Sequence, residues 1–397
     1  MDPPIKPFKI NIPNSDLARL KKKLELVEFP DELPVSDSWE YGVPITDMKR
    51  LVGYWREGYD WRQHEAELNR MPQFTTSIDV DGFGPINIHF VHKRSKRKGA
   101  IPLIFCHGWP GSFIEIVKIL PLLVDPSGDD PAFDVIAPSL PNFGFSEGPS
   151  KPGFGVHQYA ESLHKLMLKL GYDKYVTQGG DWGFSVTRFM GIRYPGHCVA
   201  SHLNYLWVNP PKLFKQPLLY LQNLLPYSKK EKEGLARTKW FYDQGYGYNV
   251  EQSTRPATIG FALEDSPVAL LAWIYEKLHD WTDSYPWSDD EILTWISIYL
   301  FSDAGPAASA RIYYETTHPS HCEHLEYNPK VKLGLSTFPG DLVVSPWCCR
   351  RTLGPVVFDA VHEEGGHFAA YEKPELLVGD LRTMFGINGG ACGIALQ

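Results

Sequence analysis

A short acidic motif occupies the position of a catalytic turn. Residues 179–183 read GGDWG, between the apolar run KYVTQ and the helix-like run FSVTRFMGIRY. The outer glycines match the frame Gly-x-Ser-x-Gly, a sharp turn between a strand and a helix that exposes its central side chain. Asp181 takes the place of the serine. The positive end of the following helix favours an anion there, and helix capping alone does not explain the glycines on both sides.

A literal Gly-x-Ser-x-Gly match lies earlier in the chain. It is GFSEG at residues 144–148, centred on Ser146, and it continues into PSKPGFG. A nucleophile elbow needs a strand, a tight turn and a helix in immediate succession, whereas this continuation is too rich in proline and glycine to begin a helix. We therefore expect Asp181, and not Ser146, to be the nucleophile.

An aspartate nucleophile indicates a particular reaction. With a pKa near 3.9, an aspartate is already ionised at pH 7 and needs no base to attack. A serine that attacked a saturated carbon would form an ether, which water does not readily cleave, whereas an aspartate forms an ester with a hydrolysable carbonyl. Asp181 therefore predicts displacement at an sp³ carbon, followed by ester hydrolysis.

The hydrolytic step needs a base and an acid that orients it. His367, in EEGGHFAAYEKPE, follows the strand-like run VVFDAVH, where the chain order nucleophile, acid, histidine places the base. Asp341 closes the run LGLSTFPGD and is the favoured acid. We expect Asp359, inside its own strand, to point elsewhere, and Glu363 and Glu364 are weaker alternatives.

An oxyanion hole is expected beside the elbow. The strand-like run IPLIFC leads directly into HGWPGS, residues 107–112, a turn that can present a backbone N–H group. We expect the two donors to be the backbone N–H groups of Trp109 and Trp182. His107 is expected to pack and to stabilise the turn, and not to act as a base.

One cluster could suggest a metal site. His318, His321, Cys322 and His324 lie together in HPSHCEH. Mixed histidine and cysteine clusters can bind zinc, but this spacing matches no standard pattern and no second ligand pair follows. We expect a polar loop, with no metal and no cofactor.

Alternating strands and helices must position these residues. From residue 74 onward the pattern indicates right-handed crossovers and a mainly parallel sheet covered on both faces, in which function collects beyond the carboxyl ends of the strands. Strands are predicted over FTTSIDV, INIHFVH, IPLIFCHG, FDVIAPSL, KYVTQGG, VASHLNYL, LGLSTFPGD and VVFDAVH, and helices from Ser112 to about Val124, over HQYAESLHKLMLKLG, from Trp182, and over PELLVGDLRTMFG.

Four segments follow from these patterns. Residues 1–73 mix proline-rich and helical pieces and are expected to form an arm that packs on the core and the lid. Residues 74–208 form the first part of the core and residues 326–397 the second. Between them, residues 209–325 read as consecutive helices with aromatic faces, which indicates an all-helical lid over the active end of the sheet.

Composition excludes several classes of protein. A net charge of −8 argues against a nucleic-acid partner, and the basic run KRSKRK at 93–98 is expected to be a solvated hairpin loop. The longest apolar stretch, VALLAWIY, is far shorter than the ~20 residues that span a bilayer, and the N-terminal residues include no apolar signal region. Six cysteines without C-x-x-C spacing are expected to be reduced. We therefore expect a cytoplasmic protein without a membrane anchor.

These motifs together resemble the microsomal-type epoxide hydrolases, and particularly their soluble fungal members. The resemblance runs along essentially the whole chain: the N-terminal arm, HGWPGS, GGDWG, STRPATIGFALEDSPVALLAWI, FPGD and EEGGHF. It implies an α/β-hydrolase fold with an inserted helical lid. It also implies Asp181 as nucleophile, Asp341 as charge-relay acid and His367 as base.

The resemblance further implies two lid tyrosines that hydrogen-bond to the oxygen of an epoxide. One precedes a Gln-x-Thr-Arg/Lys-Pro stretch and matches Tyr248 in GYNVEQSTRP; the other belongs to a Tyr-x-Glu pattern and matches Tyr313 in RIYYETT. Tyr246 and Tyr314 are rivals in register. The implied reaction is hydrolysis of a small hydrophobic epoxide to a vicinal diol through a covalent aspartyl ester.

Two departures from the mammalian branch of that family bear on the interpretation. The sequence offers no N-terminal membrane anchor, and the acid position holds Asp341 in place of glutamate. The main alternative is a haloalkane dehalogenase, which shares the aspartate nucleophile and would bind halide through the ring N–H groups of Trp109 and Trp182. A catalytically silent ligand-binding protein of the same fold is a further alternative. The arm is a candidate dimer contact, so a homodimer is also expected.

Overall fold

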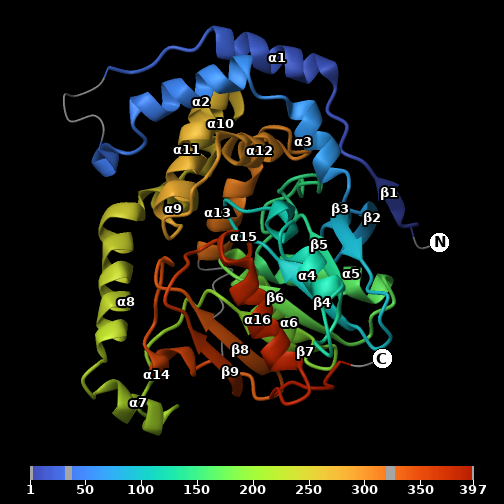
Figure 1. Cartoon of the computed structure of the whole chain (residues 1–397), viewed down its shortest axis with the longest axis vertical. Helices are drawn as coiled ribbons and strands as arrows, with labels where there is room; N and C mark the ends of the chain where they lie inside the picture. The colour runs from blue at the N-terminus through green and yellow to red at the C-terminus, as the bar shows by residue number, and fades with distance from the viewer. Residues whose placement is uncertain (1–2, 32–37, 319–326, 396–397) are drawn as a thin grey trace.

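A nine-stranded sheet forms the centre of the computed structural model, which describes residues 3–31, 38–318 and 327–395 (Figure 1). Its strands follow the order β1-β2-β3-β5-β4-β6-β7-β8-β9. The pairs among β1, β2, β3 and β5 are antiparallel, and all pairs from β5 to β9 are parallel, which confirms the predicted mainly parallel sheet. The strands are β1 Lys6–Phe8, β2 Gln73–Val80, β3 Gly84–Lys93, β4 Ile101–Cys106, β5 Phe133–Pro138, β6 Tyr175–Gly179, β7 Cys198–Leu203, β8 Lys332–Thr337 and β9 Val356–Val361.

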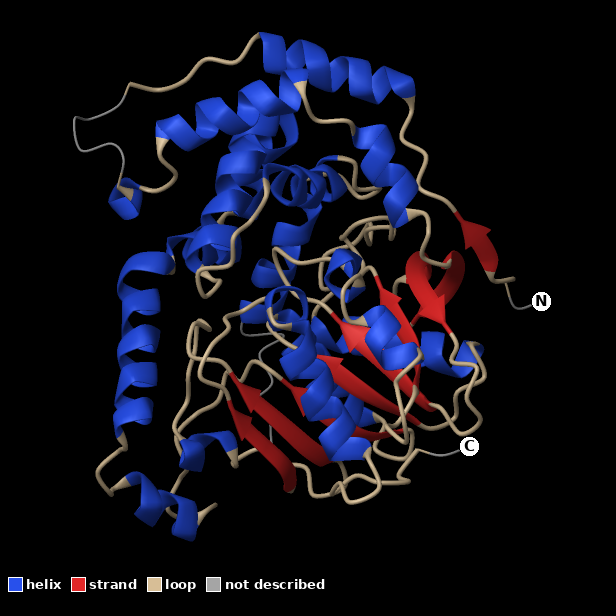
Figure 2. Ribbon diagram, in the orientation of Figure 1, coloured by secondary structure: helices blue, strands red, loops and turns tan. Residues whose placement is uncertain are grey.

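Helices cover both faces of this sheet (Figure 2). On one face, α5 (Val156–Lys169) packs on α6 (Trp182–Arg193), and α6 packs on β6 and β7. On the other face, α4 (Leu120–Val124) packs on β5 and α16 (Pro374–Phe385) packs on β8 and β9. Every residue of β4 is buried, as expected for a central strand with helices on both sides.

The predicted helix over 112–124 is wrong in one respect, because it is broken into two pieces. Residues Phe113–Ile116 form a 3₁₀ turn, η2, and α4 begins only at Leu120. Pro121 explains the break, because proline lacks an N–H group and is tolerated only in the first turn of a helix.

The basic run at 93–98 is a loop, but it is not the hairpin loop predicted from the sequence. Strands β3 and β4, which flank it, both pair with β5 and therefore lie on opposite sides of that strand. The loop thus crosses over the end of β5. Arg97 in this run donates a hydrogen bond to the Gly128 carbonyl oxygen at 2.8 Å, so part of the positive charge serves to hold the loop.

A block of helices lies between β7 and β8 in the chain, and most of it sits above the carboxyl ends of the parallel strands (Figure 1). Three N-terminal helices pack on it: α1 and α2 contact α11, and α2 and α3 contact α12. Tyr54 on α2, for example, donates a hydrogen bond to Asp290 Oδ1 at 2.8 Å. The N-terminal helices are α1 Asn14–Glu25, η1 Trp39–Tyr41, α2 Ile45–Glu57 and α3 Trp61–Leu68, and the helices of the block are α7 Pro217–Asn223, α8 Lys229–Trp240, η3 Phe241–Gly245, α9 Gly247–Thr254, α10 Pro256–Asp265, α11 Pro267–Asp280, α12 Asp289–Leu300, η4 Ala308–Ala310 and α13 Arg311–Thr317.

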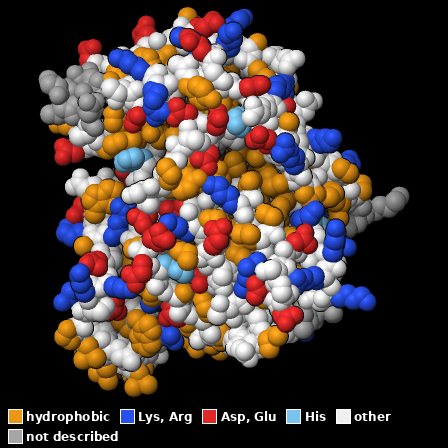
Figure 3. Space-filling model, viewed as in Figure 1, with side chains coloured by type: hydrophobic (Ala, Val, Ile, Leu, Met, Phe, Trp, Pro, Cys, Tyr) orange, Lys and Arg blue, Asp and Glu red, His pale blue; other side chains and the backbone are white. Residues whose placement is uncertain are grey.

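Helix α7 has no buried residue and leaves several apolar side chains in solvent at the lower left of the molecule (Figure 3). Phe214, just before the helix, is 99% exposed and Leu218 is 76% exposed. Helix α7 therefore adds little to the core.

The remaining short helices are α14 Trp347–Arg350 and α15 Ala369–Glu372.

The structure bears on two expectations from composition, the reduced cysteines and the lack of a membrane-spanning helix. Cys106, Cys198, Cys348, Cys349 and Cys392 all carry free thiols. In the described part of the chain, no single helix combines the length and the hydropathy needed to cross a bilayer; α10 and α11 reach both only when joined across a 115° bend.

Candidate active site

Asp181 occupies a strained turn between β6 and α6. Its backbone φ is +50°, in the region that L-residues rarely adopt and that often marks functional sites. A Cβ atom on Gly183 would lie 1.9 Å from the Cys106 carbonyl oxygen, and one on Gly179 would lie 2.6 Å from the Gly183 carbonyl oxygen. The two glycines of the motif therefore allow the turn to close against β4.

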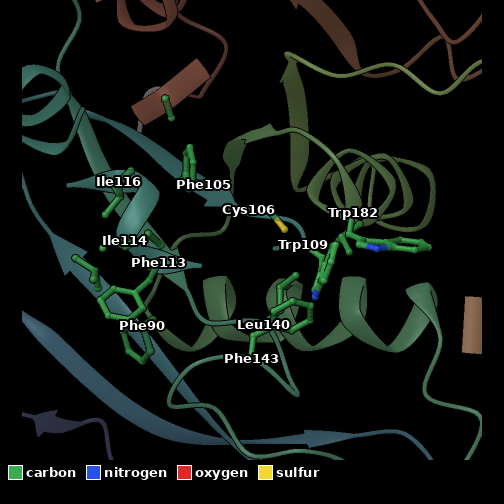
Figure 4. Close-up of a cluster of buried hydrophobic side chains, with 14 of the residues drawn as sticks. Phe90, Phe105, Cys106, Trp109, Phe113, Ile114, Ile116, Leu140, Phe143 and Trp182 are labelled. Atoms are coloured by element: carbon green, nitrogen blue, oxygen red, sulfur yellow. The ribbon is translucent and has the colours of Figure 1, made fainter. Parts of the chain in front are cut away.

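The loop after β4 holds one oxygen of this carboxylate. Strands β4 and β6 are neighbours, with Cys106 opposite Gly179, so the HGWPGS loop lies beside the elbow. The Trp109 N–H group donates a hydrogen bond to Asp181 Oδ1 at 2.8 Å. Trp182, the other expected donor, is the first residue of α6, and the two tryptophans lie next to Cys106 at the end of β4 (Figure 4). Both expected donors thus flank Asp181.

His367 lies between two carboxylates. Its Nδ1 atom is 2.6 Å from Asp341 Oδ1, and its Nε2 atom is 3.5 Å from Asp181 Oδ2. Asp341 follows β8 and His367 follows β9, so the carboxyl ends of neighbouring strands bring them together. The backbone N–H group of Leu342 donates to Asp341 Oδ1 at 2.7 Å. The backbone N–H group of His367 donates to the Trp281 carbonyl oxygen at 2.7 Å. These bonds fix the positions of both the acid and the histidine.

The electrostatics of this site favour a protonated histidine. Burial lowers the pKa of His367, but the nearby carboxylates of Asp341 and Asp181 outweigh burial and raise that pKa to about 10. Both ring nitrogens therefore carry hydrogen at neutral pH, and each faces a carboxylate oxygen.

Two aromatic hydroxyls of the helical block belong to the same site. The Tyr248 ring lies parallel to the Trp109 ring, with centroids 5.0 Å apart. The Tyr313 ring is perpendicular to the Trp182 ring at 4.9 Å, and the two tyrosine rings are 5.8 Å apart. Burial raises the pKa of Tyr248 and of Tyr313 well above the usual value, with the Asp181 carboxylate adding to the effect. Both phenols are therefore neutral hydrogen-bond donors at any physiological pH.

The rival tyrosines lie elsewhere. Tyr246 packs against Phe241 and Tyr242, with ring centroids at 5.6 and 5.1 Å. Tyr314 is 37% exposed, and its ring covers His318 at 3.8 Å. The structure thus gathers Tyr248 and Tyr313, and not their rivals, around the tryptophans that flank Asp181.

Ser146 and His107 have structural partners. Ser146 Oγ accepts a hydrogen bond from the His89 N–H group at 2.9 Å and donates one to the Ser139 carbonyl oxygen at 2.7 Å. His107 Nε2 accepts from the Leu140 N–H group at 3.1 Å, and burial lowers the pKa of His107 to about 4. Both side chains therefore hold loop backbone in place.

The alternative acids point away from His367. Asp359 forms ion pairs with Arg350 and Arg351, the latter at 3.3 Å. Glu363 is paired with Lys230 and Glu364 with Lys373, and their side chains are 77% and 61% exposed. Among these four acids, Asp341 alone bonds to the histidine.

One member of the histidine and cysteine cluster lies in the described part of the chain. His318 bonds through Nδ1 to the Tyr314 carbonyl oxygen at 2.8 Å, while His321, Cys322 and His324 lie outside the described residues. Within residues 3–31, 38–318 and 327–395, no group of three or more His, Cys, Asp or Glu side chains is arranged to hold a metal ion.

A small pocket next to the elbow, lined by both polar and apolar residues, was not predicted from the sequence. Its lining includes Asp181 and His367 together with Glu115, Gln178 and Asn204. A usable signal was present, because Gln178 and Asn204 are polar residues at the carboxyl ends of apolar strands and Glu115 is an acid inside the apolar run FIEIV. Such polar residues at strand ends in this fold face the site.

Comparisons with known proteins identify the sequence families that this chain matches. A sequence family described as "Epoxide hydrolase N terminus" matches residues 5–116, and one described as "alpha/beta hydrolase fold" matches residues 101–226. The chain is 35% identical to epoxide hydrolase 1 of Sus scrofa over 415 residues, an alignment that covers 97% of this chain and 89% of that protein.

Two solved structures resemble the whole chain. The structure of Aspergillus niger epoxide hydrolase superposes with a TM-score of 0.83 at 37% sequence identity, covering 96% of this chain and 95% of that one. The structure of juvenile hormone epoxide hydrolase from the silkworm Bombyx mori gives a TM-score of 0.86 at 30% identity and covers 96% and 93% of the two chains. The fold is therefore the α/β-hydrolase fold, as predicted.

Proposed function

This chain belongs to the epoxide hydrolase family, and on that basis we propose that it converts small hydrophobic epoxides to vicinal diols through an ester on Asp181. One observation carries the proposal. The two carboxylate oxygens of Asp181 have different partners, because Oδ1 accepts the Trp109 N–H group while Oδ2 faces His367. A carboxylate held in this way has one oxygen for attack and one that becomes the ester carbonyl.

In the first step, Asp181 Oδ2 attacks one carbon of the epoxide ring and the ring C–O bond breaks. The leaving oxygen stays attached to the substrate and is strongly basic, so ring opening needs a proton donor in the transition state. Tyr248 and Tyr313 are the proposed donors, because both phenols are neutral and stand beside the tryptophans that flank Asp181.

In the second step, water attacks the carbonyl carbon of the Asp181 ester. His367, oriented by Asp341, takes the proton of that water. Negative charge develops on Oδ1, which already accepts the Trp109 N–H group, and the Trp182 N–H group at the start of α6 is the proposed second donor. Collapse of the oxyanion releases the diol and restores the carboxylate.

Esterification itself prepares the base. At rest, the carboxylates of Asp341 and Asp181 hold His367 in its protonated form, in which it cannot act as a base. The ester on Asp181 carries no charge, so one of the two interactions that raise the pKa of His367 is lost. The imidazolium can then give up its proton, which restores the phenol that protonated the leaving oxygen, and the neutral histidine becomes a usable base for water.

A single turnover in heavy-oxygen water, with enzyme in excess, tests the proposal. The label is expected in Asp181, because water attacks its carbonyl carbon and the diol leaves with the original Oδ2. Label found directly in the diol in that turnover would mean one-step attack by water, and the covalent mechanism would be wrong.

Product analysis separates the alternatives. Incubation with styrene oxide and with 1-bromobutane, assayed for diol and for bromide, is expected to yield diol. Bromide without diol would identify a haloalkane dehalogenase, and neither product would favour a silent ligand-binding protein.

Further parts of the proposal rest on the sequence patterns and the resemblance. We propose that residues 209–325 act as a lid and residues 1–73 as an arm that supports it, in line with the packing of α2 on α11 and α12. A cytoplasmic location and a homodimer are part of the same proposal, and light scattering of the purified protein tests the dimer.

A further inference from the structure

A buried lysine of the helical block has no task in the reaction described above. Lys277 lies on α11 and is only 3% exposed. Lysine is almost never fully buried, because its charge is costly to remove from water and its long side chain can normally reach solvent. Lys277 pairs with the neighbouring Glu276, whose side chain is 34% exposed. The carboxylate of this pair therefore reaches solvent, while the ammonium group points into the protein.

The ammonium group of Lys277 lies over the ring of a proposed proton donor. Its Nζ atom is 5.0 Å from the Tyr248 ring centroid and 5.4 Å from the Trp273 ring centroid. Trp281 lies one turn further on, at the end of α11, and its ring centroid is 5.1 Å from those of both Tyr248 and His367. Residues four apart share one face of a helix, so Lys277 lies on the face of α11 that borders the active site.

Burial by itself makes Tyr248 a poor proton donor. It raises the pKa of the phenol well above the usual value, and the Asp181 carboxylate adds to this effect. Attack on the epoxide removes the charge of Asp181, but the Tyr248 ring stays buried. A phenol that loses its proton in such surroundings becomes a buried anion, which is costly without a nearby positive charge. The ammonium group of Lys277 is such a charge over the face of this ring.

The two proposed donors differ in their surroundings. The ring neighbours of Tyr313 are Trp109, Trp182 and Tyr248, and none of these side chains carries a positive charge. A cation is attracted to the face of a neutral aromatic ring, and it attracts a ring that becomes negative more strongly. Of the two phenols, Tyr248 is therefore the better placed to give up its proton.

We propose that Lys277 stabilises the phenolate that forms on Tyr248 when this residue protonates the leaving oxygen of the epoxide. This inference rests on the two-step mechanism proposed above. Asp181 bonds to a ring carbon, the ring C–O bond breaks, and the Tyr248 proton passes to the epoxide oxygen, to which Tyr313 also donates a hydrogen bond. The phenolate later recovers a proton from the imidazolium of His367. Lys277 keeps its own proton throughout and is a positioning residue that acts through Tyr248.

Lys277 must be charged for this role. Burial lowers the pKa of Lys277 to about 8, and the Asp280 carboxylate opposes this shift. The carboxylate of Glu276, paired with the ammonium group, also favours the charged form. Both acids lie on α11; Tyr248 faces the ammonium group from α9, and Arg237 on α8 lies near Asp280. Lys277 is therefore charged at neutral pH and loses its charge as the pH rises above about 8.

Lys277→Met and Lys277→Arg test this role in the full-length enzyme with styrene oxide. Methionine removes the charge and keeps an unbranched side chain, whereas arginine keeps the charge at every physiological pH. Stopped-flow tryptophan fluorescence separates ester formation from ester hydrolysis. Lys277→Met is expected to slow ester formation roughly 10- to 100-fold, the effect of removing a full charge beside a partly formed one, and to change hydrolysis less than about threefold. Lys277→Arg is expected to form the ester within about threefold of the parent rate, because arginine also stacks on aromatic rings.

The pH profile gives a readout that a purely structural role would not move. Ester formation by the parent is expected to decline as the pH rises above about 8. Lys277→Arg is expected to lose that decline, because arginine stays charged. Glu115 lines the pocket beside Asp181 and also has a pKa of about 8, so the contribution of Lys277 is the difference between the parent profile and the Lys277→Arg profile.

Lys118→Met is the matched control. Lys118 Nζ also lies over tyrosine rings, at 3.7 Å from the Tyr371 centroid and 4.6 Å from the Tyr285 centroid. Both of these rings pack on Trp287, and not on the tryptophans that flank Asp181. The control therefore removes a lysine from buried tyrosines without touching the proposed donor, and it is expected to leave both rates unchanged.

The outcomes separate this inference from the proposed function. If the parent enzyme forms no ester on Asp181, the two-step mechanism itself fails. If the parent forms the ester but Lys277→Met forms it at the parent rate, the role of Lys277 is wrong. Equal slowing of both steps in Lys277→Met would also overturn it, because the phenolate forms in the first step alone. Should Lys277→Met fail to fold, the pH profile of Lys277→Arg decides, and a profile identical to that of the parent would refute the proposal.

Discussion

His367 Nε2 lies 3.5 Å from Oδ2 of Asp181, so the proposed base and the proposed nucleophile form an ion pair with each other in the resting protein. The Asp181 carboxylate helps to raise the pKa of His367 and so to hold the histidine in its charged form. Attack on the substrate removes the charge of that carboxylate, so the same contact weakens and frees the base for the second step.

Replacing the base should separate the two steps. His367→Gln is expected to be alkylated by styrene oxide but not to turn over, because Asp181 attacks without help and only the hydrolysis needs a base. Intact-mass spectrometry should show protein plus one substrate accumulating with time. A variant that is neither alkylated nor active would contradict this division of labour.

Replacing the nucleophile should lower the pKa of the histidine. Asp181→Asn removes one of the two carboxylates that raise the pKa of His367 to about 10, so the pKa of the variant is expected to fall. NMR titration of the imidazole measures this directly. Asp341→Asn is the matched control, because it removes the other carboxylate and should also lower the pKa; an unchanged pKa in both variants would refute the electrostatic account.

The same shift predicts a pH dependence of stability. The pKa of His367 is about 10 in the folded protein against 6.5 for an ordinary histidine. Its contribution to the free energy of unfolding is therefore fully present below pH 6.5 and is lost as the pH rises through about 10. Urea unfolding at several pH values should show a smaller loss over this window in Asp181→Asn than in the parent. Equal losses in both proteins would contradict the prediction.

The phenols should govern ring opening alone. Tyr248→Phe or Tyr313→Phe is expected to slow ester formation by about 10² to 10⁴, the usual cost of losing a general acid, and to leave ester hydrolysis nearly unchanged. Quenching of the flanking tryptophans in stopped flow follows both steps. Tyr246→Phe and Tyr314→Phe are matched controls and should behave like the parent. If these controls are the sensitive variants, the register of the tyrosines is wrong.

The glycine at the start of α6 should be hard to replace. A Cβ atom at Gly183 would lie 1.9 Å from the Cys106 carbonyl oxygen, so Gly183→Ala should force the elbow away from β4 and lower the free energy of unfolding by about 1–3 kcal/mol, as in overpacked cores. Gly53→Ala on α2 meets no atom within 4 Å and should stabilise the helix by about 0.5–1 kcal/mol. Thermal unfolding compares the two, and equal effects would mean that the close contact is unimportant.

Local sequence patterns predicted the parts of the site that depend on chain order. Asp181 was identified from glycines two residues away, and His367 and Asp341 from the strands that precede them. Each of these signals is short-range. The alternation of strands and helices also predicted the mainly parallel sheet, because such alternation implies crossovers.

What could not be predicted depends on contacts between distant segments. The loop at 93–98 was expected to be a hairpin because its flanking strands are adjacent in sequence, yet both strands pair with β5. The helix from Ser112 was placed across Pro121, whose effect outweighs the apolar pattern. Glu115, Gln178 and Asn204 line one pocket but come from η2, from β6 and from the end of β7, so their proximity depends on the sheet order and not on a local pattern.

In chain order, the helical block lies between the proposed nucleophile and the residues proposed to hydrolyse its ester. A ribosome completes Trp109 and Asp181 before it reaches the block, and Asp341 and His367 only after it. A product truncated anywhere within the block therefore retains the proposed nucleophile and lacks both the proposed acid and the proposed base. A premature stop codon in that region is expected to abolish turnover while leaving the proposed nucleophile encoded.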